Sequence, residues 1–316
     1  MIRNRIMENQ KIKITKILFI ALTLFLFVSP VAASNIKTAI IYPDAIQPYA
    51  NLFSTIINGL QSDTRINTLL YKHDNEGSAN ELSSWLNKDK PDVVIALGQT
   101  SNDLVAGLNL SIPVITSAVT QPDKRHGCVC LNIEPHQLVA KLLELNPDIK
   151  RIIYVYDSNN NSWFIPVAKS VAKKAGIKLV LKSANSVQEA ALHYKEILNS
   201  KLGPTDAIWL PLDNSIPGDV ILPELLKAAW QKKFIIFSSN PFYVKRGGLF
   251  ALFPDYFALG KQLASTSIRV MNNKNKLVQE NALSAKSAIN IRMARHLGLS
   301  ISRRQLNQYD IIYPHR

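Results

Sequence analysis

Residues 93–121 read VVIALGQTSNDLVAGLNLSIPVITSAVTQ and contain two short apolar runs separated by a more polar segment. The runs Val93–Leu97 and Val114–Ala118 are rich in β-branched residues, which is typical of strands buried on both faces. Between them, Thr100 and Asp103 have the spacing of a capping box at a helix start, with Asp in place of the usual Glu. The stretch predicts a strand–helix–strand unit whose two strands are parallel.

The same alternation continues on both sides of this unit. Six further apolar runs predict strands at Thr38–Tyr42, Ile66–Tyr71, Arg151–Tyr156, Lys178–Lys182, Ala207–Leu210 and Phe234–Phe237. The segments between the runs place apolar residues at helical spacing, as in Leu52, Ile56 and Leu60. Alternating strands and helices predict an α/β fold in which parallel sheets are covered by helices on both faces.

The series occurs twice, which indicates two Rossmann-like, doubly wound lobes joined by hinge strands. A predicted helix at His136–Leu145 and a turn at Asn146-Pro147 separate the two series. We expect lobe 1 at residues 34–135, lobe 2 at 136–270, and a return segment at 271–316 that packs across the lobes and the hinge. No Gly-rich dinucleotide fingerprint or P-loop follows any predicted strand, which argues against a nucleotide-binding enzyme.

Residues 1–33 have the layout of a secretory signal peptide. Five basic residues precede an uncharged, mostly apolar run at Ile17–Val31, and Val31-Ala32-Ala33 provides a cleavage site. The run is shorter than the roughly 20 residues that a membrane-spanning helix needs. We therefore expect cleavage after Ala33 and a periplasmic location, with an uncleaved membrane anchor as the alternative.

The formal net charge of the whole chain is +14, and 32 Lys and Arg against 22 Asp and Glu follow Ala33. These basic residues are scattered in short pairs such as Lys173-Lys174, with no stripe interleaved with aromatic residues. We interpret the charge as a solvated surface, with a negatively charged partner as the alternative, and we predict no nucleic-acid partner. The hydrophobic content of 47% is ample for one large core or two smaller ones. We expect a monomer.

The cysteines Cys128 and Cys130 leave three alternatives open. Residues two apart in an extended strand have Cα atoms roughly 6.5–7 Å apart, at the outer limit of disulfide geometry. A bridge therefore requires a local bend, which Gly127 can help to supply. Buried free thiols are the second alternative, and a copper or zinc site with His126 is the third. Because three ligands within five residues cannot complete a tetrahedral set alone, we predict no metal site and no cofactor.

Ligands of doubly wound sheets bind outside the carboxyl ends of the strands. The polar or aromatic residues that follow the predicted strands are therefore candidate ligand-binding residues: Gln99, Thr100, Ser101, Thr120, Asn159, Asn161, Trp163, Asp213, Asn214 and Ser239. The helix start at Thr100 suits a carboxylate or phosphate, unless Thr100 or Ser101 serves only to cap its own helix. The run around Asn159 is equally compatible with a solvated loop. Asp213 is the strongest candidate for contact with an ammonium group.

Four groups of motifs resemble one known family in their order and spacing. They are Ile112–Ile115 with Ala118–Pro122, Asp206–Pro211 with Asp213-Asn214, Gly247–Leu249 with Asp255–Gly260, and Ala288–Ile291 with Leu297–Leu299. At these residues the chain resembles the ABC-transporter substrate-binding proteins of the tryptophan/tyrosine-binding type, which have the class I periplasmic-binding fold. It departs from the family pattern at Lys124–Cys128 and at Tyr42-Pro43-Asp44.

The resemblance implies a mechanism in which two lobes close on a small molecule of the amino-acid type and an inner-membrane permease recognises the closed form. It implies that Thr100 and Ser101 hold a ligand carboxylate from lobe 1. It also implies that Asn159 and Asp213 reach the ligand from lobe 2, with Asp213 taking an amino group, and that Asp255 lines the cleft near the hinge.

Two other function classes serve as alternatives. A regulatory or sensory periplasmic protein could reuse this fold to bind a protein partner, and a cleft filled by large apolar side chains would favour that function. An enzyme is less well supported, because the six histidines show no metal-ligand spacing and no G-x-S-x-G elbow occurs. We therefore predict a binding protein and not an enzyme.

Overall fold

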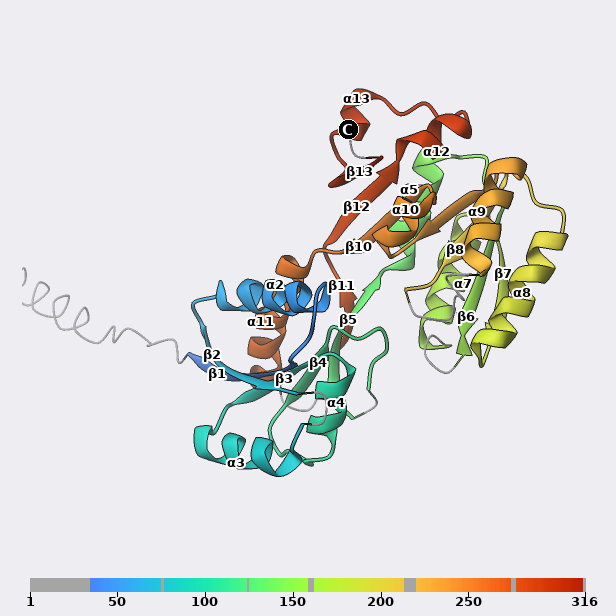
Figure 1. Cartoon of the computed structure of the whole chain (residues 1–316). Helices are drawn as coiled ribbons and strands as arrows, with labels where there is room; N and C mark the ends of the chain where they lie inside the picture. The colour runs from blue at the N-terminus through green and yellow to red at the C-terminus, as the bar shows by residue number, and fades with distance from the viewer. Residues whose placement is uncertain are drawn as a thin grey trace, which may run out of the picture. The chain divides into compact units, whose positions relative to one another are not determined.

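The structure, a computed structural model, describes residues 35–74, 77–123, 125–158, 162–212, 220–273 and 277–314. Its strands form two sheets with helices packed around each of them (Figure 1). The predicted signal peptide lies outside the described residues. Within the described ranges, no helix is long and apolar enough to cross a bilayer.

The first sheet has six parallel strands in the order β11-β5-β4-β3-β1-β2. The strands are β1 (Ile36–Pro43), β2 (Ile66–His73), β3 (Val93–Leu97), β4 (Val114–Ser117), β5 (Gly127–Ile133) and β11 (Gln279–Ala282). Its helices are α2 (Tyr49–Gln61), α3 (Ala79–Asp89), α4 (Gln99–Ala106) and α11 (Tyr256–Asn272). The central strand β3 is buried at all five positions, as its uninterrupted apolar sequence predicts.

The second sheet has seven strands in the order β13-β12-β10-β9-β8-β6-β7, and β12 pairs antiparallel with β10. The strands are β6 (Arg151–Asp157), β7 (Lys178–Ala184), β8 (Asp206–Leu210), β9 (Ile235–Ser238), β10 (Phe250–Pro254), β12 (Ala285–Asn290) and β13 (Ile311–Tyr313). The helices are α5 (Pro135–Leu145), the 3-10 turn η1 (Ser162–Phe164), α7 (Ile165–Lys174), α8 (Val187–Asn199), α9 (Ile221–Lys232), α10 (Pro241–Arg246), α12 (Ile291–His296) and α13 (Arg303–Leu306).

A row of aromatic rings runs across the second sheet. Tyr154, Trp209, Phe237 and Phe250 are register partners on neighbouring strands, so their rings lie on one face of the sheet. Successive ring centroids are 4.7, 5.6 and 5.3 Å apart. Because offset aromatic pairs add to the free energy gained from burial, this row fixes the four strands whose ends carry the loops discussed below.

The two mostly parallel sheets confirm the predicted α/β class, and all eight predicted strands are present. The predicted helix His136–Leu145 corresponds to α5. Prediction missed β5, β10, β11, β12 and β13, which complete the sheets.

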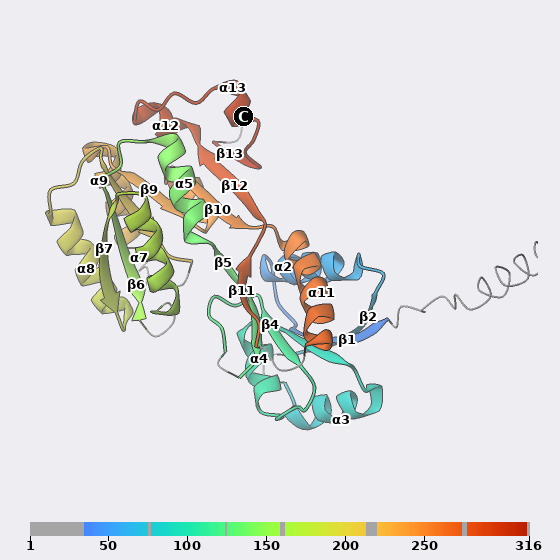
Figure 2. The same cartoon turned by 180° about the vertical axis from the view of Figure 1, so that it is seen from behind.

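The chain passes between the sheets three times, after β5, after β10 and after β11. The last two passages enclose α11, which packs along α2 of the first sheet, as both views show (Figures 1 and 2). Residues 256–270, which we expected in lobe 2, therefore belong to lobe 1, because they form most of α11. Two glycines allow this packing, since Gly59 and Gly260 sit where the helix backbones come together. Beyond β11, β12 and β13 rejoin the second sheet.

Candidate functional site

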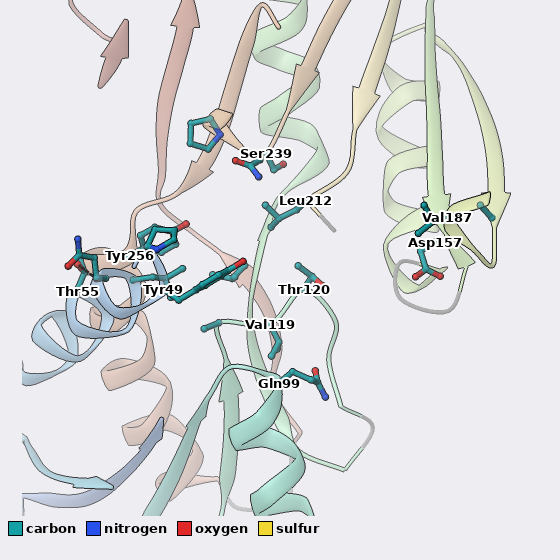
Figure 3. A pocket seen from close by; sticks show the side chains of 18 of the residues that line it. Tyr49, Thr55, Gln99, Val119, Thr120, Asp157, Val187, Leu212, Ser239 and Tyr256 are labelled. Atoms are coloured by element: carbon teal, nitrogen blue, oxygen red, sulfur yellow. Dashed lines mark hydrogen bonds between the residues drawn. The ribbon is translucent and has the colours of Figure 1, made fainter. Parts of the chain in front are cut away.

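A cavity of about 1000 Å³ is lined by residues from both sheets (Figure 3). The first sheet contributes the beginnings of α2 and α4 and the segment after β4. The second contributes the end of β6, the β7–α8 connection, Leu212 after β8, and the segment after β9. These segments follow the carboxyl ends of parallel strands, where ligands of such sheets bind. We call this cavity the cleft.

Three predicted site residues, Gln99, Thr120 and Ser239, line the cleft. Thr100 is exposed and does not line it. Ser101 is fully buried, with its hydroxyl oxygen 2.8 Å from Nε2 of His73. Its side chain therefore joins the start of α4 to the end of β2 and does not face the cleft.

Two further predicted residues, Trp163 and Asp255, do not line the cleft. Trp163 is half-buried and packs edge-on against Phe164, with 5.8 Å between ring centroids. The Asp255 carboxylate accepts hydrogen bonds from the backbone N–H groups of Phe257 and Ala258 and so caps α11. Four candidates lie outside the described residues: Asn159, Asn161, Asp213 and Asn214.

The N-terminus of α4 faces the cleft without a side-chain cap. Its N-cap residue is Gly98, which has a φ of +84°, so neither Thr100 nor Ser101 caps the helix and that alternative is wrong. Only glycine adopts this backbone conformation readily, and a Cβ there would lie 3.2 Å from Cζ of Phe53. The first N–H groups of α4, next to the cleft-lining Gln99, therefore have no side-chain acceptor among the residues that the structure describes, and a helix end of this kind favours an anion.

The wall after β4 is held by hydrogen bonds to β5. Ala118 adopts a left-handed φ of +56°, which turns the chain between β4 and the cleft. The N–H of Leu131 donates to the Val119 carbonyl, and the Asn132 side chain donates to the Thr120 carbonyl. The cleft-lining residues Val119 and Thr120 are thus positioned by β5, the strand that leads into lobe 2.

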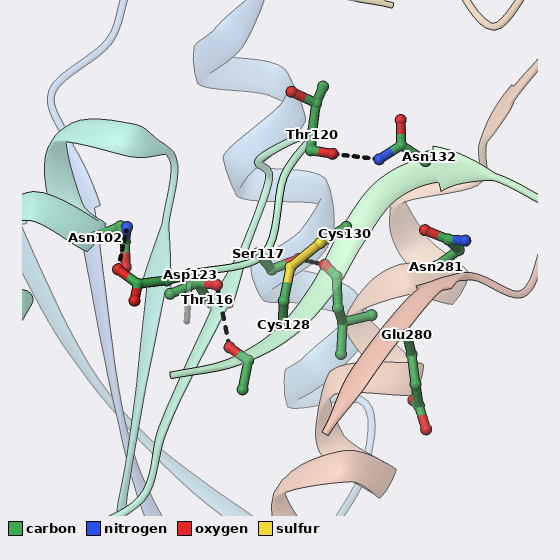
Figure 4. The surroundings of a disulfide bond; sticks show 12 residues. Asn102, Thr116, Ser117, Thr120, Asp123, Cys128, Cys130, Asn132, Glu280 and Asn281 are labelled. Carbon is green, nitrogen blue, oxygen red and sulfur yellow. Dashed lines mark hydrogen bonds between the residues drawn. A yellow bond between two sulfur atoms is a disulfide. The ribbon is translucent and has the colours of Figure 1, made fainter. Parts of the chain in front are cut away.

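Cys128 and Cys130 on β5 form a disulfide (Figure 4). Their Cα atoms are 5.5 Å apart, closer than in a regular strand, so the bend that a bridge requires is present. The pairing of β5 with β11 shifts register just beyond Cys130. Of the three alternatives, the structure contains the disulfide, and in the described part of the chain no group of three His, Cys, Asp or Glu residues is placed to hold a metal.

Two tyrosines that prediction missed give the cleft an aromatic wall. Tyr49 begins α2 and is 60% exposed, and Tyr256 begins α11. Burial, and to a lesser extent the neighbouring Tyr49, raises the pKa of Tyr256, so its hydroxyl stays protonated. The polar wall opposite includes Asn185, Ser186 and Asp157. Among the described lining residues Asp157 alone is charged.

Residues 47–310 match the family described as ABC transporter substrate binding protein. The chain belongs to this family. The resemblance seen in the sequence motifs is therefore confirmed, and the family is one of substrate-binding proteins and not of enzymes.

Similar proteins include a tyrosine-binding protein of Clostridioides difficile (strain R20291), which is 26% identical over 209 residues. That match covers 61% of this substrate-binding protein and 59% of the relative's length.

Two solved structures share the fold. A conserved domain protein of Vibrio cholerae superposes with a TM-score of 0.58 at 21% identity, covering 88% of this chain and 99% of the other. An ABC domain from Streptococcus pneumonia in complex with L-Trp gives 0.57 at 21% identity, covering 88% and 100%. Together with the two sheets, these likenesses confirm the class I periplasmic-binding fold predicted for the chain.

Proposed function

We propose that this substrate-binding protein captures one amino-acid-like molecule in the cleft, in the periplasm, and presents it to an inner-membrane ABC permease. The observation that carries the proposal is the α4 N-terminus, which lacks a side-chain cap and stands beside the cleft-lining Gln99. A helix end of this kind offers backbone N–H donors and a positive dipole to a carboxylate. The backbone N–H groups of this turn would therefore hold the ligand carboxylate, the role predicted for the side chains of Thr100 and Ser101.

The rest of the ligand would meet groups of both lobes. Tyr49 and Tyr256 supply flat apolar surface on the side of lobe 1, which suits a planar ring. Thr120 and Ser239 supply hydroxyls from opposite lobes. Because both lobes contact one ligand, binding stabilises their closed arrangement over any open one.

We keep Asp213 as the proposed partner of the ligand's amino group, with Asn159, Asn161 and Asn214 as further contacts. Asp157, at the end of β6, is a carboxylate that lobe 2 contributes to the lining of the cleft. A carboxylate that meets an ammonium group forms a charge-assisted hydrogen bond, which is stronger than a neutral one.

The relatives support an aromatic amino acid as the ligand. One is named a tyrosine-binding protein, and one solved structure holds L-Trp. A cleft of about 1000 Å³ with hydroxyl, amide and carboxylate groups also disfavours the alternative of a partner-binding protein, for which we expected a cleft filled by apolar side chains.

Isothermal titration with L-tyrosine, L-tryptophan, tyramine and tryptamine tests the proposal. We expect one molecule of an amino acid per chain, and binding of the amines that is weaker by about tenfold or more, because they lack the carboxylate that meets α4. Absence of binding by either amino acid, or equal affinity for acids and amines, would contradict it. In a parallel arm, Asp213→Ala should abolish thermal stabilisation by the ligand, whereas the exposed control Asp148→Ala should not.

A further inference from the structure

Two adjoining hollows on lobe 2 share no lining residue with the cleft. They have volumes of about 540 and 460 Å³ and have Trp230, Arg292 and Pro314 in common. Their walls come from α9, α10, α12 and the segment after β13. We call this surface the basic face and define it by the cations named next.

Five exposed cations line the basic face: Lys227, Lys245, Arg246, Arg292 and Arg295. None of them forms an ion pair with another residue in the part of the chain that the structure describes. No aspartate or glutamate is among the described residues that line the two hollows. Like charges without counterions raise the local potential, which an anionic partner would lower.

An ordered aromatic ring stands between the hollows. Trp230 is 40% exposed and stacks on His296, with 3.5 Å between ring centroids and 8° between planes. Nε2 of His296 lies 2.7 Å from the Trp230 carbonyl oxygen, and the Arg292 guanidinium lies 5.4 Å from the ring centroid. These contacts hold the ring in place in the absence of a partner, so little conformational entropy of this side chain is lost on binding.

The larger hollow combines apolar lining with a charged rim. Leu226 and Met293 line it together with Trp230, while exposed lysine and arginine side chains surround them. Tryptophan and arginine are the residue types that most often dominate the free energy of protein–protein binding. A concave surface of this kind accepts a protruding side chain, whereas a flat bilayer surface leaves a hollow unfilled.

We propose that the basic face docks an acidic segment of a partner protein. An apolar side chain of that segment enters the 540 Å³ hollow beside Trp230, and flanking carboxylates pair with the five cations. Pairing across a rim of this kind speeds association and selects the partner by charge. The proposal is independent of the ligand in the cleft, because the two sites share no lining residue.

Fluorescence anisotropy with a fluorescein-labelled peptide, Glu-Glu-Leu-Glu-Glu, and the full chain at low ionic strength tests this proposal. We expect saturable binding that Trp230→Ala weakens and that Lys227→Gln/Lys245→Gln weakens about fivefold, because two exposed ion pairs are lost. The matched control Lys169→Gln/Lys173→Gln removes the same charge from exposed lysines of α7 and should change the affinity less than about twofold. The uncharged peptide Gln-Gln-Leu-Gln-Gln should not bind.

Three results would overturn the proposal. The first is no binding of the acidic peptide. The second is equal weakening by the Lys227 and Lys169 double variants, which would show attraction by net charge alone. The third is binding to vesicles that contain anionic phospholipid, lost in the Trp230 variant, without binding of the peptide, which would make a membrane the partner.

Discussion

Two residues with a positive φ, one a glycine and one not, shape the backbone at the wall of the cleft. Gly98 takes a φ of +84° at the start of α4, where glycine has no Cβ to clash. Ala118 takes a φ of +56° after β4, a conformation that costs a non-glycine residue free energy. The first places backbone donors beside the cleft, and the second turns Val119 and Thr120 into it.

We predict that single substitutions at these two residues change the free energy of unfolding in opposite directions. Gly98→Ala should lower the free energy of unfolding by about 2 kcal/mol through backbone strain and weaken ligand binding. Ala118→Gly should raise the free energy of unfolding by about 1 kcal/mol, because glycine adopts the left-handed conformation without steric cost. Urea denaturation of both variants measures the two changes, and a stabilising Gly98→Ala would show that the backbone there is not as described.

The contact between α2 and α11 joins segments that are about 200 positions apart in the sequence. It holds α11 in lobe 1, next to the segments where the chain passes between the two sheets. A Cβ on Gly59 would lie 2.0 Å from the Phe257 carbonyl oxygen, and one on Gly260 would lie 2.0 Å from the Ile56 carbonyl oxygen. Both clashes involve backbone atoms, so the helices would have to separate. Tyr49 and Tyr256, at the starts of the same two helices, would move with them.

Gly59→Ala should therefore lower the free energy of unfolding by about 3 kcal/mol, because overpacking a helix contact forces backbone shifts. The control is Gly203→Ala, where an added Cβ meets nothing within 4 Å and the change should stay under about 0.5 kcal/mol. Thermal or urea unfolding compares the two variants. Equal stability of both would mean that the helices do not approach as closely as described.

The sequence predicted several strands whose own residues form an apolar run. The buried run Val93–Leu97 is apolar throughout, and β3 has those bounds. By contrast, β11 reads QENA, and only its last two residues are buried. This strand forms because it pairs with β5 at the edge of the first sheet, next to α11. Pairing of this kind is a tertiary effect, so the local sequence does not predict it. The assignment of α11 to lobe 2 failed for the same reason.

On the scale of the whole molecule, the rule that ligands bind beyond strand ends located the cleft but not all of its walls. It found Gln99, Thr120 and Ser239, which directly follow their strands or lie close behind them. The same rule applied to β7 would also have indicated Asn185 and Ser186. The rule missed Tyr256 because this residue follows β10, a strand that the sequence patterns did not predict.

The central claim is that the cleft holds one small molecule. Native mass spectrometry of the chain, purified without denaturation and then mixed with L-tyrosine or L-tryptophan, tests it most directly. We predict a single adduct per chain that saturates at one copy with at least one of the two amino acids, or one copy of a molecule carried through purification. Only the bare chain mass under all these conditions, or adducts that accumulate in several copies without saturation, would contradict the claim.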